Sequence, residues 1–166
     1  MKKRKTTTHI IVHTSVSTWG TAKDIDDWHK ERGYKEIGYH YVIENGYPTA
    51  KSRREGKRDD KRVGLLTPGR PEDVVGAHCI GYNDKSIGVC LIGDVRKYPY
   101  EPEQIKSLIT FLAIKCKQYS IPVENILGHY ETPNGRSHNP PKTCPDLDMN
   151  DIRRQVKDLM KQFGWA

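Results

Sequence analysis

The chain has 166 residues, of which 35% are hydrophobic, and its formal net charge is +7. This length fits one domain with a hydrophobic core, which excludes a chain that is disordered throughout. No apolar run approaches the ~18 residues that a membrane-spanning helix needs. The basic residues 2 to 5 are followed by threonines where a signal peptide would have its apolar stretch. The sequence therefore predicts a soluble protein that is made without an export signal and does not insert into a membrane.

The positive charge is concentrated in two segments. Residues 2 to 5 carry +4, and residues 51 to 62 hold seven basic and three acidic residues. Such segments can attract nucleic acid, an anionic membrane or an acidic polymer, although most charge runs are solvated loops or tails. Neither segment is interleaved with stacking aromatic residues, and helix-turn-helix, RNA-binding and zinc-finger patterns are missing. We expect no specific nucleic-acid ligand; a protein partner bound through the basic tail stays an alternative.

The four cysteines do not form a CxxC pair, and the lysine-rich chain differs from small secreted domains framed by disulfides. We expect reduced thiols. Cys90 lies in an apolar run and Cys116 in a helical pattern, so both are expected in the core. Cys144 instead lies in a proline-rich loop, residues 139 to 146, where core packing does not require a thiol.

The first part of the chain shows a strand, a helix and a second strand. Residues 9 to 13 include three consecutive β-branched residues between polar ones, which predicts a short buried strand. Residues 21 to 32 have the cap and the apolar spacing of an amphipathic helix. Residues 38 to 44 alternate as a strand, and this alternation would place Tyr39, Tyr41 and Ile43 on one face. The Asn-Gly pair at residues 45 and 46 predicts a hairpin turn.

The remainder alternates loops, strands and helices. Residues 51 to 73 are basic, rich in glycine and proline and without a sustained period, which predicts a long surface loop. Residues 86 to 92 are nearly all apolar, as in a strand covered on both faces. Helical spacing over residues 102 to 119 and about 148 to 162, and a short strand over 123 to 127, complete the pattern. Strands that alternate with helices predict an α/β fold with helices on the faces of a sheet.

Three of the seven histidines are expected at the surface or hydrogen-bonded in the core: His9, His29 and His40. His9 and His13 share a face of one strand, but a distance of about 13 Å between them is too large for both to bind one metal ion. His13 and His129 follow apolar strands, at the positions where α/β proteins place site residues. Together with the Cys144 thiolate these imidazoles suit zinc and leave the fourth tetrahedral position to water. By spacing alone, other histidines could take the place of either one.

Eight ordered segments resemble zinc N-acetylmuramoyl-L-alanine amidases, above all the small phage lysozymes of amidase type, which share a fold with peptidoglycan recognition proteins. The resemblance extends from about residue 8 to residue 162. Any one segment alone is weak, but their order makes the match specific. The segments are residues 11–13, 28–30, 38–43, 76–78, 81–83, 86–93, 128–131 and 142–145.

The resemblance implies that His13, His129 and Cys144 bind Zn²⁺. It further implies that Tyr39 and Lys142 form the catalytic pair. The implied reaction is hydrolysis of the amide bond between N-acetylmuramic acid and L-alanine through a zinc-activated water.

His78 matches a site histidine of the family that contacts the substrate or the reacting oxygen. The implied fold is a central mixed, mostly parallel β-sheet flanked by α-helices in a single domain. We accordingly divide the chain into a basic N-terminal tail, residues 1–7, and a zinc amidase catalytic domain, residues 8–166. The basic segment of residues 51 to 73 is longer than in the shortest relatives, and the tail before Thr6 has no clear counterpart in the family.

Simple chemistry supports the implied catalytic pair. In an extended loop Lys142 and Cys144 point the same way, so the ammonium would lie beside the metal and could stabilise an oxyanion. Tyr39 could donate a hydrogen bond or assist proton transfer. Without the resemblance, a solvated loop cation and simple aromatic packing would be the expected roles of these two residues.

Two further residues lie near the implied ligands in sequence. Glu131 could orient a ligand imidazole as an acceptor, and a surface salt bridge is the alternative. His138 lies six residues before Cys144 and is the main competing ligand; we expect its removal to leave the metal bound.

The sequence thus predicts a monomeric peptidoglycan hydrolase, a phage or prophage endolysin. It would be made in the host cytoplasm and would reach the cell wall through a separate pore-forming protein. Two alternatives use the same fold: a non-catalytic peptidoglycan-binding protein, in which the zinc cysteine is typically lost, and a regulator that acts through the basic tail. A zinc deaminase is excluded because no PCxxC motif is present.

Overall fold

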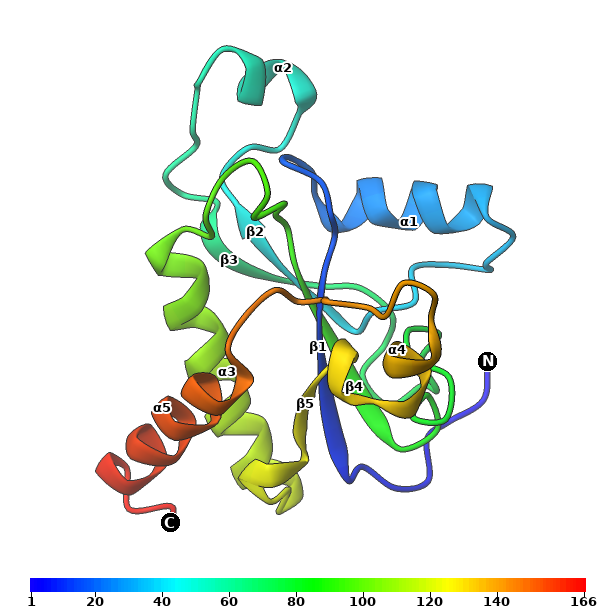
Figure 1. Cartoon of the computed structure of the whole chain (residues 1–166), viewed down its shortest axis with the longest axis vertical. Coiled ribbons are helices and arrows are strands. Elements are labelled where there is room, and N and C mark those ends of the chain that lie inside the picture. The colour runs from blue at the N-terminus through cyan, green and yellow to red at the C-terminus, as the bar shows by residue number, and fades with distance from the viewer.

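The computed structural model describes residues 1–166 and has a five-stranded sheet at its centre, in the order β3-β2-β4-β1-β5 (Figure 1). β1, β2, β4 and β5 are parallel, and β3 runs antiparallel to β2 at one edge. The predicted mixed, mostly parallel sheet flanked by helices is confirmed. The strands are β1 (His9–Thr14), β2 (Tyr41–Asn45), β3 (Val63–Pro68), β4 (Ser86–Leu91) and β5 (Ile126–Gly128). The helices are α1 (Ala22–Glu31), α2 (Ala50–Arg54), α3 (Pro102–Tyr119), α4 (Pro133–Ser137) and α5 (Met149–Gln162), with short 3-10 turns η1 (Val123–Asn125) and η2 (His129–Glu131).

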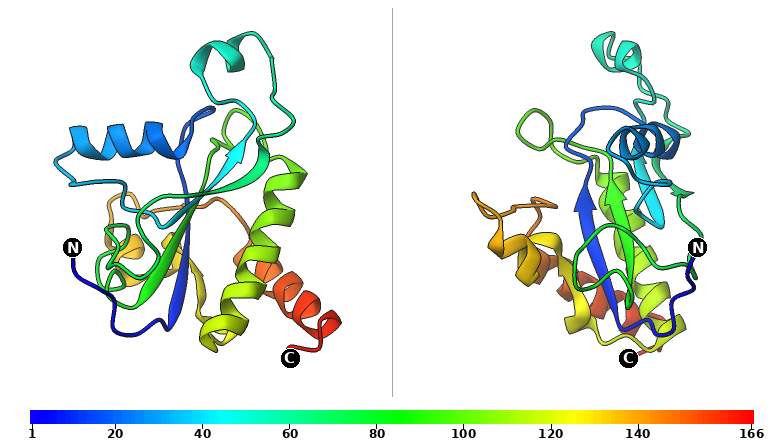
Figure 2. Two further views of the ribbon diagram at one scale, coloured as in Figure 1. Left: turned by 180° about the vertical axis from the view of Figure 1, so that it is seen from behind. Right: turned by 90° about the vertical axis from the view of Figure 1, so that its right-hand side faces the viewer.

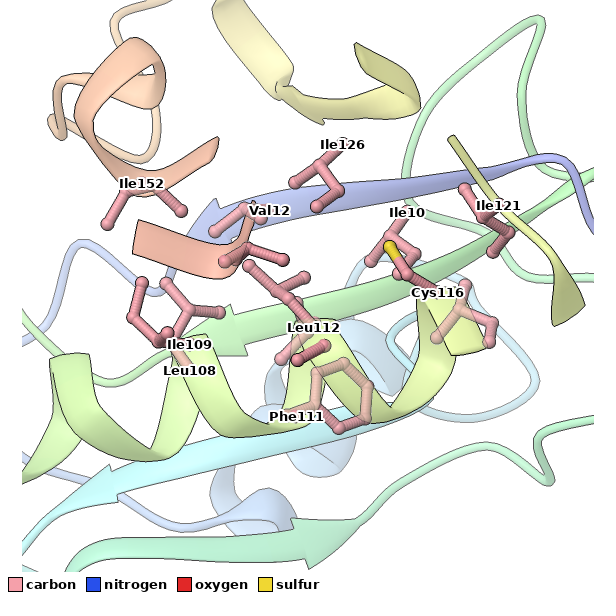
Figure 3. Close-up of a cluster of buried hydrophobic side chains, with 14 of the residues drawn as sticks. Ile10, Val12, Leu108, Ile109, Phe111, Leu112, Cys116, Ile121, Ile126 and Ile152 are labelled. Carbon is pink, nitrogen blue, oxygen red and sulfur yellow. The ribbon is translucent and has the colours of Figure 1, made fainter. Parts of the chain in front are cut away.

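One face of the sheet carries the main hydrophobic core. Side chains alternate along a strand, so Ile10 and Val12 of β1 point to this face together with alternate residues of β2 and β4. Leu108 and Leu112 of α3 and Ile152 of α5 pack on them in a cluster of 18 buried residues (Figure 3). This cluster fixes the sheet against two helices.

The opposite face carries a much smaller cluster of five buried hydrophobic residues beneath α1. It includes Ile25 of α1, Val42 of β2 and Cys90 of β4. Because so few apolar residues cover this face, polar side chains of the same strands are left to form a site there.

The predicted helix boundaries agree closely with the structure. Thr21 caps α1 in a reciprocal capping box with Asp24, Pro102 occupies the first turn of α3, and Asp148 caps α5. These caps satisfy backbone N–H groups that would otherwise lack partners. None of the helices has the length and apolarity that crossing a membrane requires.

The segment after β2 differs from its prediction in two ways. Residues 51 to 73 are not one loop, since they contain the end of α2 and all of β3. Gly46 has a positive φ of 88°, yet β2 and β3 are joined by a protruding excursion through α2 rather than by a two-residue turn (Figure 2). This edge strand lacks a clear alternation of apolar and polar residues, because the neighbouring Leu65 and Leu66 are both exposed and Gly64 and Pro68 interrupt the pattern.

The face assigned to Tyr39 was also wrong. β2 begins only at Tyr41, so the regular alternation does not extend back to Tyr39. Tyr41 packs on the main core, whereas Tyr39 packs on the smaller cluster with Val42. This places Tyr39 on the face of the sheet where the site lies.

The N-terminal residues are bound to the domain. Lys3 forms a β-bridge with Val74, and the Arg4 guanidinium donates to the main-chain oxygens of Glu72 (2.6 Å) and Val74 (3.3 Å). Much of the first basic run therefore covers the segment that precedes His78.

Candidate active site

A cleft of 610 Å³ opens at the carboxyl ends of the parallel strands. β1 and β5 lie side by side (Figure 1). His13 lies near the carboxyl end of β1 and His129 directly follows β5, as expected for ligand sites in open α/β sheets. Tyr39, His78 and the loop that carries Cys144 form further parts of the wall. Every site residue predicted from the sequence therefore lines one cleft.

His13, His129 and Cys144 form a compact donor cluster. One ligand atom from each side chain lies within 4.8 Å of the others, and the centroids of the two imidazole rings are 4.9 Å apart. Tetrahedral zinc with bonds of about 2.0–2.3 Å spaces such atoms by roughly 3.3–3.6 Å. A small contraction of these side chains would satisfy that geometry, so the residues fit a zinc ion.

Burial controls the protonation of this cluster. It lowers the pKa of His13 well below its usual value and also lowers that of His129, with neighbouring positive charge acting in the same direction. Both imidazoles are therefore neutral at pH 7 and able to bind a metal. Burial raises the pKa of the Cys144 thiol to about 12, so the sulfur keeps its proton until a cation is present.

The loop of residues 138–146 is tied to the sheet at its functional end. The Thr14 N–H donates to Cys144 Sγ at 3.1 Å, and the Tyr130 N–H donates to the Cys144 carbonyl at 3.0 Å. These contacts hold the sulfur between the ends of β1 and β5. A donated N–H bond also favours the thiolate form of a cysteine.

The two histidines of the cluster each have a protein partner at Nε2. His13 Nε2 lies 2.8 Å from His78 Nδ1, and His129 Nε2 lies 2.9 Å from Asn134 Oδ1. Glu131 does not orient either ring, because its carboxylate accepts from the Gly128 N–H and from the Arg153 guanidinium at 2.8–3.0 Å. The alternative role for Glu131, a salt bridge, is the observed one.

Sequence reasoning missed Asn134. It lies in the first turn of α4, where Thr132 caps the helix. The Thr-Pro-Asn helix start at residues 132 to 134 is the only local signal, and it predicts a helix rather than a partner for an imidazole.

The two residues expected to form the catalytic pair, Tyr39 and Lys142, line the same cleft as the cluster. The Tyr39 ring is 4.9 Å from the His13 ring, centroid to centroid, and burial raises the pKa of its hydroxyl well above 10, so the proton stays on it. Lys142 is exposed on the cleft wall, near enough for its charge to contribute to the lowered pKa of His13. His138 also lies on this wall, outside the donor cluster.

His29 and His40 are hydrogen-bonded core residues, as predicted. Their Nδ1 atoms accept from the N–H groups of Gly38 and Gly88, both at 2.9 Å. Burial lowers the pKa of each to about 4. They support the backbone around the site in their neutral form.

Comparison with known proteins agrees with this geometry. A family model described as N-acetylmuramoyl-L-alanine amidase matches residues 3–146. The endolysin of Klebsiella phage KP32 is 33% identical over 156 residues, covering 89% of this chain and 85% of the relative. The endolysin of Escherichia phage T7 is 34% identical over 156 residues, covering 89% and 86%. The structure of the N-acetylmuramoyl-L-alanine amidase LysC from Clostridium intestinale URNW superposes with a TM-score of 0.69 at 25% identity, over 91% of this chain and 85% of that one.

The fold and the extent of the match define the class, and the chain belongs to the N-acetylmuramoyl-L-alanine amidase family. Phage endolysins are among its relatives within that family. It is accordingly a peptidoglycan hydrolase of the phage endolysin type.

Proposed function

We propose that this amidase depends on zinc held by His13, His129 and Cys144, and that it releases stem peptides from N-acetylmuramic acid. The observation that carries the proposal is the convergence of these three donors, from two strand ends and a distant loop, within 4.8 Å. Two neutral imidazoles and one thiolate are a donor set that zinc prefers, and three protein ligands are typical of a catalytic site.

Bound zinc would supply Lewis-acid activation of a water molecule and of the scissile carbonyl. The residues around it have separate tasks. Lys142 brings a positive charge close to the oxygen that becomes negative when the carbonyl is attacked. Tyr39 holds a proton on its hydroxyl at neutral pH and can donate it as a hydrogen bond to the reacting group. His13 and His129, neutral because they are buried, keep their lone pairs available.

We also propose where the enzyme acts and how it reaches its substrate. The enzyme would act on the wall after release from the host cell through a separate pore-forming protein, as a monomer. The basic residues would then favour approach to the anionic wall, an attraction that salt screens. Lysis that does not weaken between low and high ionic strength would contradict this electrostatic contribution.

The test is mass spectrometry of the fragments released from purified peptidoglycan, combined with measurement of bound zinc. The parent protein should release stem peptides that begin at L-alanine and leave the glycan strands intact. Cys144→Ala should release none and lose its zinc. Cys116→Ala is the matched control, because its thiol is buried on α3 outside the donor cluster. A Cys144→Ala protein with normal peptide release would overturn the zinc assignment, and cleaved sugars would overturn the reaction.

A further inference from the structure

We propose that Ser86 and His78 on one side, and Asn134 on the other, are positioning residues that fix the tautomers of the two metal-binding histidines. In each ring Nε2 would carry the hydrogen and Nδ1 would face the metal. The inference rests on the proposed zinc site and deepens it. It follows from two hydrogen-bond chains, one at each histidine, whose directions are fixed because each chain ends in an atom that can only accept a hydrogen bond.

The first chain starts at a main-chain carbonyl. Ser86 Oγ lies 2.7 Å from the Tyr82 carbonyl oxygen, which can only accept, so the serine hydrogen points to it. Ser86 Oγ is then an acceptor for His78 Nε2 at 3.2 Å. With its hydrogen on Nε2, His78 accepts at Nδ1, and its partner there is His13 Nε2 at 2.8 Å. The hydrogen of His13 therefore lies on Nε2.

The backbone is shaped to hold His78 in this position. A Cβ atom placed on Gly88 would lie 2.6 Å from the His78 ring, and one placed on Gly76 would also lie 2.6 Å from it. Gly88 is a glycine in a fully buried central strand, a place where glycine is otherwise unfavourable. The Asn83 side chain accepts from the main-chain N–H of His78 at 2.8 Å and fixes the backbone at this residue. The ring thus occupies a slot that two missing side chains create.

The chain at the other histidine is shorter. Asn134 Oδ1 is an acceptor, so His129 Nε2, 2.9 Å away, must donate to it. Asn134 is held in the first turn of α4, where the Thr132 hydroxyl accepts from the Gly135 N–H at 3.1 Å. His129 is therefore left with a lone pair on Nδ1, the same atom as in His13.

Metal-binding histidines usually donate their second nitrogen to an acceptor, which fixes the ring and raises its basicity. Here both acceptors are uncharged, an imidazole and an amide, where a carboxylate is common in metal sites. This assignment gives His78 a role that acts through His13, instead of the direct substrate contact implied by resemblance.

The tautomers can be read directly by ¹⁵N NMR of the histidine rings in the full-length protein, without metal and after addition of Zn²⁺. The expected spectrum has protonated Nε2 in His13, His78 and His129. On zinc addition, the largest shifts should be those of the Nδ1 signals of His13 and His129, while both Nε2 atoms keep their hydrogens. An Nε2 of His13 or His129 that carries no hydrogen, or that moves more than Nδ1 when zinc is added, would overturn the proposal.

Variants test the energetic effect through zinc affinity, measured by competition with a chromophoric chelator. Ser86→Ala and Asn134→Ala should each weaken Zn²⁺ binding about 10–100-fold, and Asn134→Asp should restore it by keeping an acceptor. Ser107→Ala is the matched control, since Ser107 also donates to a main-chain carbonyl, that of Gly64 at 2.6 Å, but lies on α3. Its zinc affinity should equal that of the parent.

The outcomes separate this proposal from the zinc site itself. If the parent binds zinc while Ser86→Ala and Asn134→Ala bind it equally well, the positioning roles are wrong and the proposed function stands. If the parent binds no zinc, both proposals fail. Thermal unfolding of the metal-free variants shows whether a loss of affinity reflects a damaged fold, and the Co²⁺-loaded Asn134→Asp protein should regain the thiolate-to-metal absorption of the parent.

Discussion

The two faces of the central sheet use alternate residues of the same strands for different purposes. On the α3 and α5 face, β1 contributes Ile10 and Val12 to a cluster of 18 buried residues. On the other face it contributes His13 to the cleft, beside a cluster of only five. The same division occurs in β4, where Val89 packs in the core and Gly88 makes room for His78. One face therefore provides the stability that lets the other hold buried polar groups.

Truncating a side chain on the core face should have the largest effect on stability. Leu112 is fully buried between α3 and the sheet, so Leu112→Ala should lower the free energy of unfolding by about 2–5 kcal/mol. Chemical denaturation measures this change. Activity per folded molecule should stay near that of the parent; a large loss would show that the two faces are not separable.

Removing the charge of Lys142 should lower the activity and leave the stability nearly unchanged. Lys142→Met deletes the charge beside the cluster, and peptide release should fall about 10²–10³-fold, as when one oxyanion donor is lost. Because Lys142 is exposed, the free energy of unfolding should change by less than about 0.5 kcal/mol. Lys161→Met, at the far end of α5, is the control. Equal activities of the two variants would remove Lys142 from the reaction.

Acid should destabilise the site face first. His40 has an unfolded pKa of 6.5 and a folded pKa of about 4, because burial disfavours its charged form. The unfolded chain then binds more protons in this range, so stability is complete above pH 6.5 and falls by about 3 kcal/mol as the pH approaches 4. In His40→Gln, the slope of unfolding free energy against pH between pH 4 and 6.5 should fall by the equivalent of about one bound proton. An unchanged slope in His40→Gln would contradict the assignment.

The smallest effect is expected where the N-terminal residues meet the site face. Arg4→Ala removes the bonds to Glu72 and Val74 and should lower the free energy of unfolding by about 1–3 kcal/mol. Lys5→Ala is the control. If both variants have the stability of the parent, the N-terminal residues do not contribute to the segment that precedes His78.

Much of the architecture could be predicted because the pattern of the sequence is local. The apolar spacing and the caps define α1, α3 and α5 to within one or two residues. β3 escaped prediction because its apolar residues do not alternate with polar ones and a glycine and a proline lie within it. Tyr39 was placed on the wrong face because alternation applies only within a regular strand, and β2 starts two residues later.

The residues of the candidate site could also be predicted only in part from the sequence. Residue chemistry and family resemblance brought His13, His129 and Cys144 together, and the structure places them in one cluster. Their hydrogen-bond partners could not be predicted. Ser86 and Asn134 are ordinary polar residues, and only the fold shows that their side chains lie 3.2 Å and 2.9 Å from histidine Nε2 atoms of the site.

The bond between Thr14 and Cys144 joins residues 130 positions apart. During synthesis on the ribosome the three donors therefore cannot meet until nearly the whole chain has emerged. Closing so long a loop costs conformational entropy that burial of the core must offset. A chain that ends before residue 144 would contain all five strands but would lack the cysteine of the donor cluster.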